Sequence, residues 1–468
     1  MTDELTRSSD TIPDARVADT VDGLRSTYAT GRTRSARWRI EQLRGIERMM
    51  VEREGEITRA LAADLGRNPV EAWLTDISGV RNEAAYARTR VRRWMRRRLQ
   101  PVPLNRMPAL GWVQYESLGV VLVIGAWNCP IAVTLNPLVA ALAAGNCAVL
   151  KPSEMAPATS HLLARLMPEY VDSDAVAVIE GDANTTQELL AQGFDHAFFT
   201  GGTETGRKVM SGAAQRLTPV TLELGGKCPA IVTKGADLDS TARRIAWTKL
   251  VNSGQTCIAP DYVLVERSVR DDLVARLVRT ITEFRSDAGS PGLPIVNERH
   301  FDRITEYLTR TGGTVAFGGR SDRSTLTIDP TVPVDPDPDE PVLREEIFGP
   351  VLPVLTVDSV DEAIAFVRAR PKPLAAYFFT RSPAVQRRLL SEISSGGAVV
   401  NHAAVHYSVP GLPFGGVGAS GMGAYNGKWG FETLSHRKAV LVQRFKPDPR
   451  FVYPPYTARK IKLLRRFV

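Results

Sequence analysis

Cys257 and Glu223 are the two side chains whose types and surroundings best suit covalent chemistry, and they lie 34 residues apart. Cys257 is part of NSGQTCIAP, a polar segment, whereas a cysteine that serves only packing is expected in an apolar run. Only a small fraction of a free thiol is ionised at neutral pH, but the thiolate is a strong nucleophile once its surroundings favour it. Cys257 is therefore a candidate nucleophile.

Glu223 lies near the end of the apolar stretch VTLEL, just before Gly225–Gly226. A carboxylate in this place is partly desolvated, which raises its pKa toward the range that suits a general base. Taken one at a time, Cys257 and Glu223 could each be structural. A thiol hydrolase would pair Cys257 with an imidazole, and none of the six histidines lies in a recognisable Cys/His motif.

Two segments have the features of nucleotide contacts. Residues 196–206, HAFFTGGTETG, predict a strand that ends in Gly201–Gly202 and a helix that begins at Thr203. Glycine lets the backbone approach a phosphate closely, and a helix N-terminus offers free N–H groups. Lys151 and Glu154 in KPSE follow another predicted strand and could grip a sugar, although as isolated residues they would more often form a surface ion pair.

Three other patterns are poor candidates for ligand sites. G-x-G-x-x-G occurs at Gly416, Gly418 and Gly421, but no strand–helix–strand unit surrounds it, so we expect a tight turn there. The acidic segment 335–340, DPDPDE, is stiffened by two prolines and lacks the spacing of a calcium loop, so no metal site is predicted. The four cysteines at 129, 147, 228 and 257 form neither a disulfide framework nor a metal knuckle.

These candidate residues need a scaffold that brings distant segments together. Residues 17–98 have helix-like spacing, interrupted at 66–69, and prolines at 101, 103 and 108 end the helical run. Short apolar strands then alternate with helices, which predicts a doubly wound, mostly parallel sheet that binds ligands where its strands end. Strands are expected at 119–125, 147–151, 175–180, 196–200 and 220–224, with helices at 131–144, 160–170, 185–192 and from 203. A second α/β region at about 228–405 has predicted strands at 262–266 and 398–400 and a helix at 269–284.

The composition of the 468 residues, 43% hydrophobic and 24% charged, is typical of a globular protein of two or three domains. The longest apolar stretch, 118–127, is too short to span a membrane, and the N-terminus lacks a secretion signal, so a cytoplasmic protein is expected. The net charge of +8 is local, because residues 81–98 carry +7, residues 437–468 carry +9 and the rest carries −8. An acidic body argues against a nucleic-acid-binding protein. The tail RKIKLLRRFV could contact a partner subunit or, weakly, a membrane surface.

The chain resembles the aldehyde dehydrogenase superfamily over roughly residues 16–458, and the similarity is greatest to the class 3 branch, which includes fatty, aromatic and coniferyl aldehyde dehydrogenases. Seven segments carry the resemblance in order and spacing: GVVLVIGAWNCP, NCAVLKPSE, FFTGGTETG, TPVTLELGGK, NSGQTCIAPDY, EEIFGP and LPFGGVGASGMGAYNGKWGFETLSH. The resemblance implies an enzyme that oxidises an aliphatic or aromatic aldehyde to its carboxylic acid with NAD, or with NADP.

By this resemblance, Cys257 attacks the aldehyde carbonyl to give a thiohemiacetal, and Asn128 donates its side-chain amide to the developing oxyanion. Hydride transfer to the nicotinamide leaves a thioester, and Glu223 activates the water that hydrolyses it. An enzyme that passes the acyl group to coenzyme A would not need this last step.

The resemblance also implies the cofactor contacts. Lys151 and Glu154 match the pair at the adenosine ribose, and Glu346 matches the residue at the nicotinamide ribose. A carboxylate at Glu154 favours NAD over NADP because it repels a 2′-phosphate. The remaining implied contacts are Trp127, Gly201, Gly202, Thr203, Glu204, Thr205, Gly206 and Phe348.

Two residues are expected to line the substrate pocket. Trp247 matches an aromatic residue of that pocket, although a core tryptophan is the alternative. Cys129 lies where the branch usually has an aromatic side chain, so a wider substrate tunnel is expected. Cys228 and His402 also depart from the pattern, where serine and aspartate are usual, but neither departure removes a catalytic residue.

The implied fold is α/β, with a doubly wound NAD(P)-binding domain at 1–96 and 118–222 and an α/β catalytic domain at 223–405. A small β oligomerisation element and tail are expected at 97–117 and 406–468, in a homodimer. Two alternatives remain open: a dehydrogenase that forms acyl-CoA, and a catalytically idle binding or structural protein on the same fold.

Overall fold

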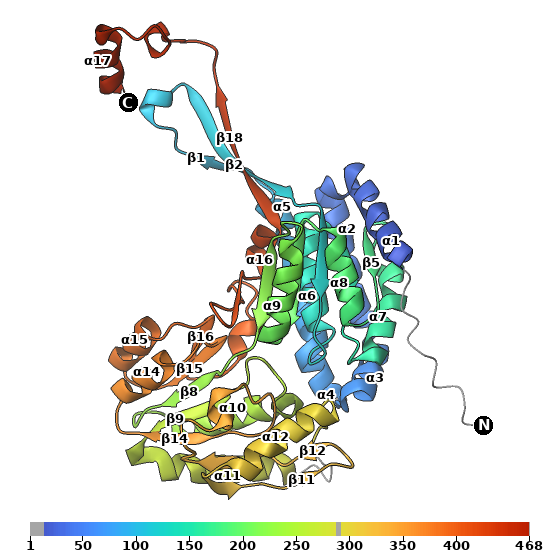
Figure 1. The fold of residues 1–468 in the computed structure, drawn as a ribbon, viewed down its shortest axis with the longest axis vertical. Helices are drawn as coiled ribbons and strands as arrows, with labels where there is room; N and C mark the ends of the chain where they lie inside the picture. The colour runs from blue at the N-terminus through green and yellow to red at the C-terminus, as the bar shows by residue number, and fades with distance from the viewer. Residues whose placement is uncertain (1–13, 287–291, 468) are drawn as a thin grey trace, which may run out of the picture.

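The computed structural model describes residues 14–286 and 292–467, which fold into two α/β units and an extended arm (Figure 1). The first unit contains a six-stranded sheet of order β17-β7-β6-β3-β4-β5. Its strands are β3 (Val120–Ile124), β4 (Cys147–Lys151), β5 (Val176–Val178), β6 (His196–Gly201), β7 (Val220–Leu224) and β17 (Gly421–Met422). The first five are parallel, and β17 runs antiparallel to β7. The predicted doubly wound sheet is confirmed.

Helices cover both faces of this sheet. They are α1 (Asp14–Ala29), α2 (Ala36–Glu52), α3 (Glu54–Leu65), α4 (Pro69–Ala72), α5 (Ser78–Trp94), α6 (Ala132–Ala144), α7 (Pro157–Tyr170), α8 (Ala183–Gln192) and α9 (Thr203–Ala214). The break predicted at 66–69 is confirmed, because Gly66 ends α3 in a left-handed conformation with φ +69°.

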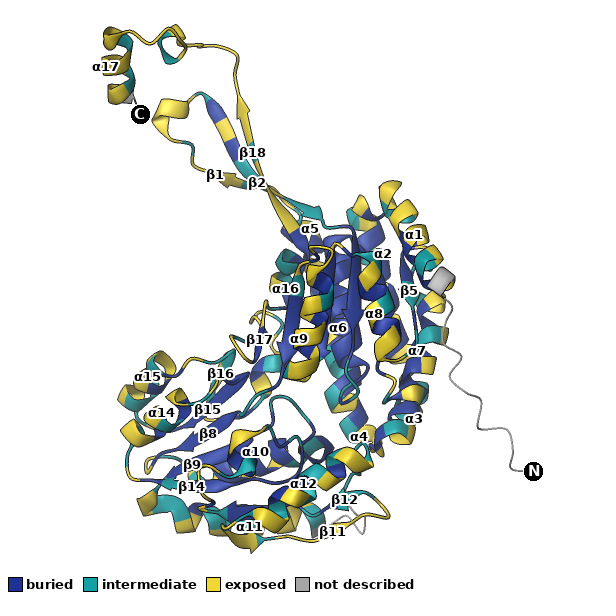
Figure 2. Cartoon of the chain, viewed as in Figure 1, coloured by how far each residue is buried: buried dark blue, intermediate teal, exposed yellow. Residues whose placement is uncertain are grey.

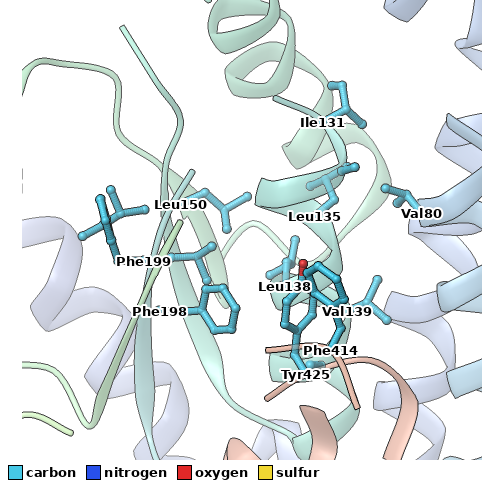
Figure 3. Close-up of a cluster of buried hydrophobic side chains, with 14 of the residues drawn as sticks. Val80, Ile131, Leu135, Leu138, Val139, Leu150, Phe198, Phe199, Phe414 and Tyr425 are labelled. Atoms are coloured by element: carbon cyan, nitrogen blue, oxygen red, sulfur yellow. The ribbon is translucent and has the colours of Figure 1, made fainter. Parts of the chain in front are cut away.

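Helix α6 lies in the middle of the first unit and is buried along its whole length. Its sequence, AVTLNPLVAALAA, is apolar on every side, as expected for a helix without a solvent-facing stripe. Leu135, Leu138 and Val139 pack in one cluster with Phe198 of β6 and with Tyr425, which follows β17 (Figure 3). This packing connects the C-terminal part of the chain to the first sheet and fixes the loop that precedes α6.

The second unit contains a seven-stranded sheet of order β10-β13-β14-β9-β8-β15-β16. Its strands are β8 (Pro229–Val232), β9 (Tyr262–Glu266), β10 (Thr314–Phe317), β13 (Val332–Val334), β14 (Val354–Val357), β15 (Ala375–Phe379) and β16 (Gly397–Val400). Its helices are α10 (Leu238–Leu250), α11 (Arg270–Ser286), α12 (Glu298–Arg310), α13 (Pro341–Arg344), α14 (Val360–Arg368) and α15 (Pro383–Glu392), and a short hairpin joins β11 (Ser321–Asp322) to β12 (Thr327–Ile328). The strands predicted at 262–266 and 398–400 are confirmed.

A three-stranded antiparallel arm projects from the first unit (Figure 1). It consists of β1 (Arg98–Gln100), β2 (Ala109–Ser117) and β18 (Ser435–Gln443), with α16 (Gly427–Thr433) before β18 and α17 (Ala458–Phe467) at the end of the described chain. Most of the arm is exposed, whereas the central strands of the two sheets are buried (Figure 2). None of the helices in residues 14–286 and 292–467 has the length and apolar character needed to cross a bilayer.

Candidate active site

Cys257 lies in the loop that joins α10 to β9, directly after a short turn at Val251–Gly254. Three successive residues of this turn, Asn252, Ser253 and Gly254, have left-handed φ angles of 51°, 49° and 72°. The main chain around the thiol is fixed from two sides: Cys228 Sγ donates to Cys257 O at 3.4 Å, and Tyr377 Oη donates to Ile258 O at 2.5 Å. The loop therefore presents Cys257 in one orientation.

The Cys257 thiol is partly accessible, but most of its surroundings are protein. Burial raises its pKa well above the ordinary value, and the nearby Glu223 carboxylate raises it further. Cys257 is consequently protonated at neutral pH. A nucleophilic role requires that the thiol give up this proton as it attacks.

Glu223 lies on β7, where it is paired in register with Thr200 of β6 and with Gly421 of β17. Its side chain is buried, and its Oε1 has no hydrogen-bond partner among the described residues. Burial raises the pKa of Glu223 to about 8, although the N–H of Gly416 partly opposes the rise. The carboxyl group thus has the properties of a general base near neutral pH. It is close enough to Cys257 for the two groups to interact electrostatically.

The glycines of the G-x-G-x-x-G pattern form the wall beside this base. Gly421 N donates to Gly418 O at 3.2 Å, which closes the expected tight turn. Gly421 has φ +135°, and a Cβ atom at this position would overlap Leu222 O. Only glycine lets β17 lie this close to the strand that carries Glu223.

Asn128 lies between β3 and α6 and is buried. Its Nδ2 donates to Gln255 O at 3.2 Å. Since Gln255 precedes Cys257 by two residues, this bond holds the amide against the loop that carries the thiol. An amide nitrogen carries two N–H groups, and this bond uses one of them. The sheet edge, the α10–β9 loop and the start of α6 therefore bring Cys257, Glu223 and Asn128 into one site.

The predicted cofactor residues at the ends of β4 and β6 also share one edge of the first sheet. Lys151 Nζ and Glu154 Oε2 are 2.7 Å apart, with the lysine buried and the glutamate about half exposed. Gly202 precedes the first turn of α9, which holds Thr203, Glu204 and Thr205, and a Cβ atom on Gly202 would meet no other atom within 4 Å. This open backbone at a helix N-terminus fits a pyrophosphate, and the Lys151–Glu154 pair fits a ribose.

Gly201 and Gly206 have a different reason to be glycine. A Cβ atom on Gly201 would lie 2.5 Å from Phe199 Cζ, and one on Gly206 would lie 2.6 Å from Leu224 Cδ2. Gly206 lets α9 pack closely on β7, and Gly201 leaves room for the Phe199 ring of its own strand, β6. They shape the loop, while Gly202 leaves it open to a ligand.

Glu346 lies beside the glycines that follow β7, and Phe348 contacts Trp127. A Cβ atom on Gly225 would overlap the Glu346 carboxylate, so the glycines after β7 are what let this side chain reach the strand end. Burial raises the pKa of Glu346 to about 8. Phe348 has φ +50°, and its ring contacts Trp127 edge-on with centroids 5.4 Å apart.

The two predicted pocket residues lie in different surroundings. Trp247 on α10 is 43% exposed and contacts His402 edge-on at a centroid distance of 6.4 Å, so a core tryptophan is the wrong interpretation. Cys129 follows Asn128, and burial raises the pKa of its thiol to about 11. The Arg67 guanidinium donates to Cys129 Sγ at 3.6 Å, so this cation takes up one side of the thiol.

Several residues that fix the site gave no clear signal in the sequence. Lys227 lies in the LELGGK segment. Its buried ammonium group donates hydrogen bonds to Asp261 Oδ2 at 2.6 Å, Val342 O at 2.7 Å and Glu345 O at 2.9 Å. Arg303 on α12 donates to Glu346 O at 3.1 Å and to Ile347 O at 2.9 Å. Lys227 could have been suspected from its place after two glycines, whereas Arg303 reads as an ordinary charged residue of an amphipathic helix.

Comparisons with known proteins identify the family of the chain. A family model described as "Aldehyde dehydrogenase family" matches residues 4–440. Mouse (Mus musculus) aldehyde dehydrogenase family 3 member A2 is 44% identical over 450 residues, which cover 95% of this chain and 93% of that protein. The rat (Rattus norvegicus) protein named "Aldehyde dehydrogenase, dimeric NADP-preferring" is 44% identical over 450 residues, with 95% and 98% covered. The substrate-bound structure of Staphylococcus aureus AldH is similar with a TM-score of 0.92 and 38% identity, covering 96% of this chain and 99% of that one.

Proposed function

Since the chain belongs to the aldehyde dehydrogenase family, we propose that Cys257, Glu223 and Asn128 carry out its NAD(P)-dependent oxidation of an aldehyde. The enzyme oxidises aldehydes with NAD or NADP as the cofactor, through the cysteine mechanism that is general to the family. The observation that carries the residue assignment is the buried Glu223 carboxyl group, which has an unpartnered oxygen and a pKa of about 8 beside the Cys257 thiol.

In the first step, the Cys257 thiol gives up its proton to water as its sulfur attacks the aldehyde carbonyl. The carbonyl oxygen then carries a developing negative charge, and the free N–H of Asn128 Nδ2 and the Cys257 backbone N–H donate to it. Loss of one donor of this kind costs roughly a hundred- to a thousand-fold in rate in other oxyanion holes. The product of this step is a thiohemiacetal on Cys257.

In the second step, the thiohemiacetal carbon gives up a hydride, which bound NAD or NADP would accept, and a thioester remains on Cys257. Lys151, Glu154 and the open backbone at Gly202 would hold the adenosine and pyrophosphate end of this cofactor, and Glu346 and Phe348 would hold the nicotinamide end. Lys227 and Arg303 fix the segment of Glu346 and keep it in place for this contact. The geometry thus separates cofactor binding from the acid–base group.

In the last step, Glu223 takes a proton from water, which attacks the thioester and releases the carboxylic acid and the Cys257 thiol. This role distinguishes a hydrolytic enzyme from one that forms acyl-CoA, because transfer to a thiol cofactor needs no activated water. The presence of a base with a pKa of about 8 favours the hydrolytic enzyme. An idle protein on the same fold is set aside, because the family is enzymatic and all three residues converge.

The exposed apolar residues of the arm support the proposal of a homodimer. Leu99, Leu110, Leu441 and Phe445 are 68%, 63%, 56% and 100% exposed, although the arm has few buried residues to pack on. Exposed apolar patches of this kind mark protein interfaces. Residues 97–117 and 406–468 are accordingly proposed as the oligomerisation element, beside an NAD(P)-binding domain at 1–96 and 118–222 and a catalytic domain at 223–405.

The basic helix α17 is proposed to lie at the subunit interface, next to the arm. Its apolar residues Ile461 and Leu463 are 41% and 38% exposed in the single chain. Co-sedimentation with anionic vesicles would instead assign the helix to a membrane surface. The four free thiols agree with the proposed location in the cytoplasm, where cysteines stay reduced.

Three measurements test the proposed function. Purified protein is incubated with NAD or NADP and a series of aliphatic and aromatic aldehydes, and the product is identified as acid or, with coenzyme A added, as thioester. Cys257→Ala is expected to abolish turnover while NAD binding remains. Glu223→Gln is expected to release one reduced cofactor per active site in the first turnover and then nearly stop; full steady-state acid production by this variant would remove Glu223 from the mechanism.

A further inference from the structure

Arg67 and Asp76 form an ion pair in the interior of the first unit, between the end of α3 and the start of α5. Arg67 Nη1 donates to Asp76 Oδ2, and both side chains are completely buried. A buried ion pair is weak evidence for stability, because desolvation of the two charges offsets most of their attraction. The presence of this buried pair is therefore not explained by a contribution to folding stability.

The guanidinium of Arg67 also reaches both loops that carry the active-site residues. Arg67 Nη2 donates to the backbone carbonyl of Asn128, and Arg67 Nε donates to Asn252 Oδ1 at 3.3 Å. Asn252 Nδ2 in turn donates to Asn128 O at 3.2 Å and to Gln255 O at 3.1 Å. One cation thus joins the loop of the oxyanion donor to the loop of the nucleophile.

Asp76 fixes the other side of the Asn128 loop. Its Oδ1 accepts the backbone N–H groups of Ile131 at 3.0 Å and of Ala132 at 2.9 Å, where α6 begins. The N-cap residue of α6 is Ile131, whose apolar side chain offers no acceptor, so Asp76 supplies the cap from a distant segment. Residues 128–132 are consequently held at both ends by the same ion pair.

We propose that Arg67 and Asp76 are a positioning pair, which holds the Asn128 amide over the Cys257 loop so that the oxyanion donor is in place before substrate binds. The inference rests on the proposed roles of Cys257 and Asn128. The oxyanion donors must lie within a few tenths of an ångström of the developing charge, and a misplacement of about 1 Å can cost a hundred-fold in rate. Among the described residues the Asn128 amide donates only to Gln255 O, and this single bond leaves the loop that carries Asn128 to be fixed by other contacts.

The experiment isolates the step that the oxyanion donors accelerate. In the Glu223→Gln background, hydrolysis is blocked and stopped-flow absorbance records only the first release of reduced cofactor at saturating NAD and aldehyde. Adding Arg67→Met is expected to slow this burst roughly ten- to a hundred-fold, with its amplitude still near one per active site. The dissociation constant for NAD, measured by fluorescence quenching, is expected to stay within about two-fold, which a general loss of structure would not allow.

A double-mutant cycle then asks whether Arg67 acts through Asn128. Asn128→Ala alone slows the burst, and Arg67→Met added to it is expected to slow it by less than about three-fold more, because the group being positioned is already gone. Multiplicative losses, or an unchanged burst rate in Arg67→Met, would overturn the proposal. If Arg67→Met does not fold, Arg67→Lys decides: a three- to ten-fold slower burst supports the proposal, and an unchanged burst refutes it.

Arg39→Met is the matched control. The buried Arg39 guanidinium donates to Ala143 O at 3.1 Å and to Thr33 O at 3.3 Å, at the opposite end of α6. It is expected to lower the melting temperature but to leave the burst rate unchanged. Absence of any burst in the Glu223→Gln parent would refute the proposed function itself, and this outcome is distinct from a failure of the positioning pair.

Discussion

The ionisation of Glu223 makes a quantitative prediction about the pH dependence of turnover. With a pKa of about 8, about one-tenth of the Glu223 side chains is ionised at pH 7 and about nine-tenths at pH 9. Hydrolysis of the thioester requires the ionised form, so its rate is expected to rise roughly ten-fold between these two pH values and then to level off.

The assay is the steady-state formation of reduced cofactor between pH 6 and pH 9.5, at constant ionic strength and saturating NAD and aldehyde, after the first-turnover burst. The burst shows at each pH that hydrolysis limits the rate. A flat profile, or a rise centred below pH 6, would refute the role of burial in setting the pKa of Glu223. Glu223→Gln provides the control, because its steady-state rate should no longer rise with pH. If the rate of this variant still rose, the rise would belong to the ionisation of another group.

The same pKa also predicts the pH dependence of stability, with a definite sign. The folded protein keeps the Glu223 proton up to about pH 8, whereas the unfolded chain releases it near the ordinary value of 4.5. The free energy of unfolding therefore falls as pH rises between these values, by up to about 4 kcal/mol from pH 5 to pH 9. Glu223→Gln is expected to remove this part of the fall. The difference between the urea midpoints of variant and wild type, measured at pH 5 and pH 9, checks it.

Three further predictions concern the cofactor, the glycine turn and the arm. Glu154→Gln removes the carboxylate that we propose lies at the adenosine ribose, so KM for NADP is expected to fall about ten-fold relative to KM for NAD; an unchanged ratio would contradict the ribose assignment. Gly421→Ala is expected to unfold at a lower temperature and to lose activity, because its Cβ atom would overlap Leu222 O, whereas Gly202→Ala should fold normally. Leu441→Glu is expected to convert a dimer into monomers in light scattering, whereas Lys438→Glu, which makes the same strand still more negative, is the control and should leave the dimer intact.

The sequence predicts the first sheet well because each parallel strand there is a short, continuous apolar run that ends in polar or glycine residues. The run VVLVI at 120–124 and the run HAFFTG at 196–201 are fully or almost fully buried. The length of each apolar run therefore predicts both the strand and the residue at which it ends. Since ligands bind at strand ends, Lys151, Gly202 and Glu223 could be placed at one edge before any coordinates. That part of the site follows from local pattern alone.

Fewer strands of the second sheet are predicted, because some of its strands contain residues that are unusual in strands. Strand β13 has the sequence VPV and β8 begins with Pro229, so proline obscures two of its strands. Strand β17 has only two residues, and nothing in a two-residue segment indicates that it pairs with β7, about 200 residues earlier in the chain. Long-range pairing of short strands is fixed by tertiary packing, which periodicity does not report.

Arg67 illustrates a different limit of sequence reasoning. It lies in the break between α3 and α4, where a charged residue is expected to be solvated, yet it is among the most deeply buried side chains of the described chain. Its partners Asp76, Asn128 and Asn252 are 9, 61 and 185 residues away. A buried network of this kind leaves no periodic trace, because each member alone resembles a surface or turn residue.

Some buried charged groups in this enzyme are paired with an opposite charge, and others are not. This difference indicates whether a group holds the structure or takes part in proton transfer. Arg67 is bonded to Asp76 and Lys227 to Asp261, so each charge is compensated and its further donors hold loop carbonyls. Glu223 has no ionic partner of this kind and one unpartnered oxygen, so burial disfavours its charged form and raises its pKa to about 8. A compensated charge can only hold a structure, because giving up its proton would break the pair. An uncompensated carboxyl group changes its protonation state near neutral pH at little cost, and this is the property that water activation requires.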